Sequence, residues 1–129
     1  MVNKKGEVKI GDFGLCRDLG KKGKPLTIKV MTLLYRAVEV LLGAPKYTNK
    51  VDMWSMGCIL AELLICEPLF ITARSPNNII DLISARCGPS TEETWPGVTA
   101  LKYYDELFPK KPVNAKGNLK DYIYKKNPK

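Results

Sequence analysis

A carboxylate in a short motif near the amino terminus, Asp12-Phe13-Gly14, is the first feature that could do chemistry. Three residues mean little alone, because an aspartate before glycine can simply make a turn. The chain of 129 residues contains no histidine, which excludes Ser-His-Asp and Cys-His mechanisms built within it. Any chemistry must therefore rest on carboxylates, lysines or a metal.

The cysteines do not predict a metal site. No two of them have the two-residue separation typical of zinc ligands, and there is no histidine to complete a set. We expect reduced thiols, mostly buried, at the four cysteine positions, which are Cys16, Cys58, Cys66 and Cys87.

Several further motifs follow Asp12-Phe13-Gly14 in a fixed order. They are Thr32-Leu33-Leu34-Tyr35-Arg36-Ala37-Val38-Glu39, the run from Tyr47 to Leu64, Glu67-Pro68-Leu69-Phe70 and Trp95-Pro96-Gly97. In this order and spacing the chain resembles cyclin-dependent-type (CMGC group) serine/threonine protein kinases, and within them the PITSLRE and PISSLRE subgroup. The resemblance runs from about Val8 to Val98 and weakly to Leu119. It implies a kinase and transferase, seen here as a carboxyl-terminal-lobe fragment that starts just before Asp-Phe-Gly.

The resemblance implies a nucleotide-binding role for the first motif. Asp12 would be the ligand of the Mg²⁺ that bridges the phosphates of ATP, with Phe13 and Gly14 beside it, because a hard cation prefers carboxylate oxygen. The alternative is that Asp12 only makes the turn. One carboxylate without a phosphate-binding loop would hold magnesium poorly, so ATP and Mg²⁺ binding by this chain alone is doubtful.

The resemblance also implies a regulatory threonine. Thr27 lies five residues before Thr32, which is the family spacing of the activating phosphothreonine, and Arg17 matches one of the arginines that clamp the phosphate. The alternative is an ordinary loop threonine.

The same comparison implies a substrate-facing stretch made of Met31, Thr32 and Arg36, which receives the residue after the phosphoacceptor, usually a proline. Arg36 could instead be a surface or packing arginine. Glu39 and Asp52 correspond to two structural carboxylates of the family. Their usual partners lie in segments that this sequence does not contain.

The catalytic set expected for such a kinase is incomplete. No glycine-rich loop, phosphate-anchoring lysine or His-Arg-Asp base is found, and only eleven residues precede Asp12. Three interpretations stay open: a truncated or partial serine/threonine kinase inactive alone, a non-catalytic pseudokinase-like binding module, and a decayed remnant. In the full-length family the partners are a cyclin and a protein substrate.

The elements that must position these residues are mainly helical. We expect a partial protein-kinase-like fold over residues 1–129, divided into a short β-strand pair with Asp-Phe-Gly (1–17), an activation segment (18–39), core helices (40–90) and an irregular basic tail (91–129). A short helix is expected over residues 37–42, a helix buried on nearly all sides over 51–65 after an N-cap at Thr48, and a helix from Ser75-Pro76 to Gly88. Because segments that would cover this core are missing, we also expect exposed apolar surface.

The net charge and the composition limit which partners are expected, but they do not indicate a function. The net charge of +8 is concentrated at the two ends of the chain, and interleaved tyrosines near the carboxyl end could suggest nucleic-acid binding. No nucleic-acid motif accompanies the charge, so a solvated basic surface is the favoured interpretation. No apolar run is long enough for a transmembrane helix. We therefore expect neither nucleic-acid nor membrane partners, and a location in the nucleus or cytoplasm.

Overall fold

The computed structural model describes residues 1–16, 32–108 and 116–128. The elements in these ranges are the α-helices α1 (Val38–Leu41), α2 (Lys50–Ile65), α3 (Pro76–Cys87), α4 (Tyr104–Leu107) and α5 (Leu119–Lys126), with the 3-10 helices η1 (Phe13–Leu15), η2 (Leu33–Tyr35) and η3 (Val98–Ala100). The expected mainly helical class is confirmed. Residues 17–31, which include Arg17, Thr27, Met31 and most of the expected activation segment (18–39), lie outside the described residues.

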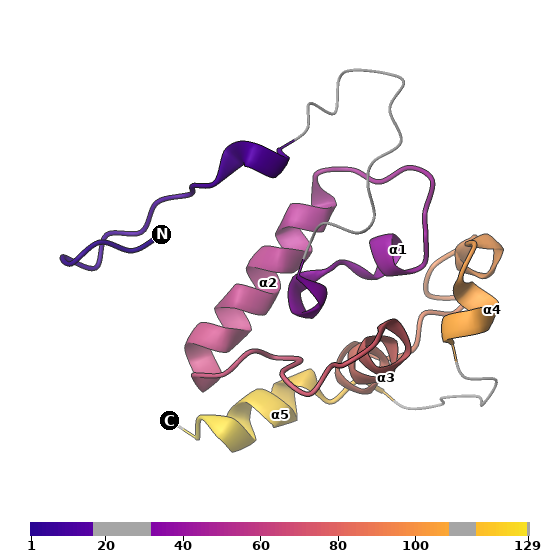
Figure 1. Cartoon of the computed structure of the whole chain (residues 1–129). Coiled ribbons are helices and arrows are strands. Elements are labelled where there is room, and N and C mark those ends of the chain that lie inside the picture. The colour runs from indigo at the N-terminus through magenta and orange to yellow at the C-terminus, as the bar shows by residue number, and fades with distance from the viewer. Residues whose placement is uncertain (17–31, 109–115, 129) are drawn as a thin grey trace.

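Residues 1–16 form an extended arm that leads away from the helices (Figure 1). Its β structure is one antiparallel bridge between Val2 and Val8, around a turn in which the Asn3 side chain accepts backbone N–H groups of Lys5 and Glu7. The expected strand pair on either side of Asp12 is not formed, and η1 occupies its second half. Isolated two-stranded ribbons are marginal in water, and residues 1–16 are exposed apart from Gly11, which is half-buried.

The helix α2 is apolar around its whole circumference, as the sequence indicates, but only one side is covered. Val51, Cys58, Ala61 and Ile65 are buried, whereas the opposite side faces solvent. The expectation of burial on nearly all sides is therefore wrong, and the expectation of exposed apolar surface is confirmed. Composition shows that a helix can be covered, but not that a neighbour covers it.

The ends of α3 form as predicted. Ser75 is the N-cap, and its Oγ accepts the backbone N–H of Asn78 at 3.2 Å, while Pro76 occupies the first turn. Gly88 ends the helix with φ of 92°, a conformation that glycine adopts without strain. The expected start of α2 is close as well: the helix begins at Lys50, two residues after Thr48.

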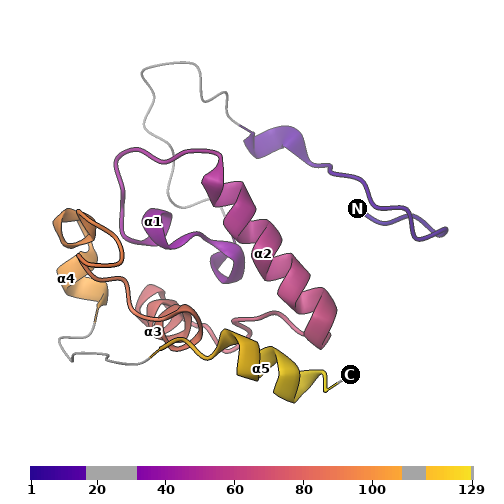
Figure 2. The same ribbon diagram turned by 180° about the vertical axis from the view of Figure 1, so that it is seen from behind.

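The core lies where α1, α2 and α3 converge (Figures 1 and 2). Phe70 and Leu42 are its largest fully buried side chains together with three residues of α3 and η3, namely Ile79, Ile80 and Val98. The Trp54 ring stacks on Phe70 with centroids 6.5 Å apart and an interplanar angle of 7°. This stack joins α2 to the segment that leads into α3.

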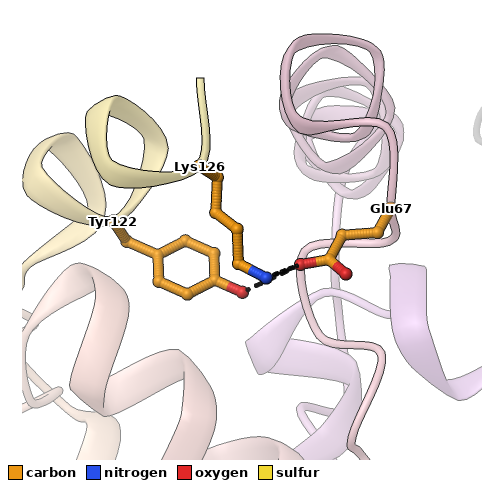
Figure 3. Close-up of polar contacts among 3 residues, drawn as sticks. All are labelled: Glu67, Tyr122 and Lys126. Carbon is orange, nitrogen blue, oxygen red and sulfur yellow. Dashed lines mark hydrogen bonds and ion pairs between the residues drawn. The ribbon is translucent and has the colours of Figure 1, made fainter. Parts of the chain in front are cut away.

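The tail expected to be irregular contains α5, which lies along α2 and α3 (Figures 1 and 2). Leu119 and Ile123, four residues apart, pack against the core. Lys126 Nζ forms an ion pair with Glu67 Oε1 at 2.6 Å, and the Tyr122 hydroxyl donates to the same oxygen at 3.5 Å (Figure 3). The short apolar spacing in a lysine-rich stretch was the only local signal for this helix.

The start of α5 is tied to α3 by a second set of contacts. The guanidinium of Arg86 lies 3.7 Å from the centroid of the Tyr122 ring and donates to Asn118 Oδ1 at 3.2 Å. The Asn118 backbone N–H donates to the Ala85 carbonyl at 3.1 Å. These contacts are long range in the sequence, which explains why local patterns did not predict the helix.

Candidate functional site

Asp12 is presented at the end of the amino-terminal arm. It precedes η1 with φ of 61° and ψ of 63°, a left-handed conformation that aspartate tolerates better than most residues. Its side chain makes no capping hydrogen bond and is exposed, and Phe13 is 64% exposed. The motif therefore forms a local turn whose carboxylate is accessible.

A magnesium ion would find one protein ligand in this turn. Mg²⁺ in phosphate-transferring sites is usually held by one or two carboxylates together with phosphate oxygens and waters. Within the described ranges, no group of three or more Asp, Glu, Cys or His side chains could hold a metal. Asp12 thus fits as a single metal ligand and the described residues do not complete a site, so we derive no reaction step through a metal.

The stretch with Thr32 and Arg36 is held on α2 by contacts that the sequence did not predict. The backbone between them forms η2, where the Tyr35 hydroxyl donates to Glu62 Oε2 at 2.7 Å. The Ser55 hydroxyl donates to the Tyr35 carbonyl at 2.9 Å. Side chain and backbone of one residue are therefore both anchored to α2.

The Tyr35–Glu62 contact changes the acidity of the phenol. The pKa of Tyr35 is raised above its ordinary value, first because its proton is shared with the Glu62 carboxylate and second because the ring is partly buried. The signal available in the sequence was a single glutamate, Glu62, within an otherwise apolar run. Such a residue requires a polar partner when it lies beside a packed surface.

Thr32 is exposed and Arg36 is half-buried, four residues apart on either side of η2. The structure thus places these two predicted substrate-facing residues on one anchored stretch. Asp12 belongs to a different part of the described chain, the arm of residues 1–16 that leads away from the helices (Figure 1).

The two predicted structural carboxylates lie at helix starts. Glu39 is half-buried in the first turn of α1, and its backbone carbonyl accepts the N–H of Ala44 at 2.9 Å. Asp52 is exposed in the first turn of α2. A carboxylate near a helix amino terminus is favoured by the helix dipole, which is a sufficient local reason for both positions.

The cysteines differ from the expectation of mostly buried thiols. All four are free, but Cys58 alone is buried, whereas Cys16, Cys66 and Cys87 are exposed. Burial raises the pKa of the Cys58 thiol to about 11, so this group is neutral and unreactive at ordinary pH. Cys66 ends α2 in a left-handed conformation, with φ of 59°.

Comparison with known proteins decides the family. The sequence pattern of the protein kinase domain matches residues 1–120. The chain belongs to the protein kinase family. This kinase chain is 46% identical over 114 residues to cyclin-dependent kinase G-2 of Oryza sativa subsp. indica, an alignment covering 88% of the chain and 16% of that relative.

Two other relatives agree. Cyclin-dependent kinase G1 of Arabidopsis thaliana is 44% identical over 114 residues, covering 88% of the kinase chain and 18% of the relative. Cyclin-dependent kinase 11.1 of Caenorhabditis elegans is 45% identical over 115 residues, covering 88% and 16%. The predicted resemblance to cyclin-dependent-type kinases is confirmed. The kinase chain spans less than a fifth of the length of these relatives.

Within residues 1–16, 32–108 and 116–128, no helix combines the length and the apolar character needed to cross a bilayer.

Proposed function

We propose that this chain contributes the substrate-side part of a cyclin-dependent-type protein kinase that transfers phosphate from ATP to serine or threonine of proteins. Identities of 44–46% to cyclin-dependent kinases of a cereal, a second plant and a nematode support this proposal. The proposed substrates carry a proline directly after the phosphoacceptor, and Met31, Thr32 and Arg36 would contact that proline. The anchoring of η2 on α2 gives two of these residues a fixed support.

The proposed nucleotide role belongs to Asp12, with Phe13 and Gly14 holding it in its turn. Asp12 would supply one oxygen ligand to the Mg²⁺ on the ATP phosphates, as protein kinases use such an aspartate. Its exposed carboxylate is free of a capping role, which leaves it available to a metal. Thr27 would receive an activating phosphate that Arg17 pairs with, and Glu39 and Asp52 would have structural roles.

We further propose that the chain alone does not transfer phosphate. The observation that carries this proposal is the isolation of Asp12: within the described residues it belongs to no cluster of metal-binding side chains. A single carboxylate neither binds magnesium firmly nor removes the proton of a substrate hydroxyl at a distance.

A phosphorylation assay tests the proposal. The purified chain, supplied with magnesium, labelled ATP and a Ser-Pro or Thr-Pro peptide, should give no transfer above background. The matched variant is Asp12→Asn, which keeps the size and turn-forming ability of the side chain but removes its charge. Reproducible transfer by the natural chain that Asp12→Asn abolishes would contradict the proposal of inactivity.

The genomic sequence upstream of residue 1 tests the family role separately. A reading frame encoding a glycine-rich loop, a lysine-bearing strand and a His-Arg-Asp loop would support a complete kinase. Stop codons throughout that region would contradict it.

A binding module without catalysis is the second candidate, because the exposed apolar side of α2 favours contact with another protein. A cyclin and a kinase substrate are the partners that the names and chemistry of the relatives suggest for the complete kinase. A pull-down with the purified chain that recovers no specific protein would count against the module.

A further inference from the structure

We draw no further inference here: the strongest candidate, the apolar cavity between α2 and α5 that Trp54, Phe70 and Ile123 line, reaches the exposed side of α2 at Leu60, and nothing in the described residues shows what covers that side.

Discussion

The contact between Tyr35 and Glu62 gives the sharpest prediction for the substrate-facing stretch. Tyr35→Phe removes the hydroxyl that donates to Glu62 Oε2 at 2.7 Å and leaves the ring in place. The Ser55 bond to the Tyr35 backbone carbonyl is unaffected. The substitution therefore tests one hydrogen bond rather than the packing of η2.

The expected loss follows from the charge of the acceptor. A hydrogen bond to a charged group contributes about 1.5–3 kcal/mol to stability, and partial exposure of this pair lowers the figure to about 1–2 kcal/mol. Folded domains are stable by only about 5–15 kcal/mol, so the loss is measurable. We expect the Tyr35→Phe substitution to lower the free energy of unfolding by about 1–2 kcal/mol.

Urea titration followed by the fluorescence of Trp54 and Trp95 measures this loss at a fixed low protein concentration. Tyr124→Phe is the matched control, because its ring is 58% exposed, and it should change stability by less than about 0.5 kcal/mol. The loss from Tyr35→Phe should at least halve in a Glu62→Gln background. An equal loss in both backgrounds would refute the proposed contact.

The same contact predicts a pH dependence. Since the folded state raises the pKa of Tyr35 above 10.0, its contribution is complete below pH 10 and is lost as pH rises through the folded value. The stability difference between the natural chain and Tyr35→Phe should therefore shrink in strongly alkaline buffer. A difference that grew there would contradict the assignment.

Three further predictions concern the framework. Ser75→Ala should cost about 1 kcal/mol in urea titration because the N–H of Asn78 loses its cap, and Ser75→Asp should retain most of that stability; equal losses would argue against capping. Phe70→Ala should cost about 3–5 kcal/mol, since this side chain is 1% exposed, and a loss under 1 kcal/mol would mean that the core repacks freely. Lys126 holds the pKa of Glu67 below its ordinary 4.5, so Glu67→Gln should increase amide exchange in α5 at neutral pH. The natural chain should lose that protection only as the solution is acidified through the lowered pKa, and identical exchange in both chains would disprove the anchor.

The sequence predicted elements wherever a local signal was strong. Ser75-Pro76 and Gly88 bound α3 because an N-cap, a first-turn proline and a terminal glycine act through neighbouring backbone atoms. The prediction of a strand pair around Asp12 was wrong, because alternating polar and apolar residues form a strand only when a partner covers the apolar side. For α5, the decisive contacts come from Glu67 and Arg86, which are far away in the sequence.

The same difference between local signals and distant contacts applies to the candidate site. Motif order was enough to place the chain among the kinases, and it named Asp12, Thr32 and Arg36 as residues to examine. It could not show that Asp12 has no metal-binding cluster around it among the described residues, or that Tyr35 fixes the neighbouring stretch to α2. Those facts depend on which distant side chains meet.

The sequence by itself determined the family, the helical class and the apolar character of α2, because these depend on residue types and their spacing. The tertiary structure alone decided which side of α2 is covered. Val51, Cys58, Ala61 and Ile65 are buried, whereas Met53, Met56, Leu60 and Leu63 are more than half exposed. Burial is a property of the neighbours as much as of the residue, because the hydrophobic effect acts only on apolar surface that another element removes from water.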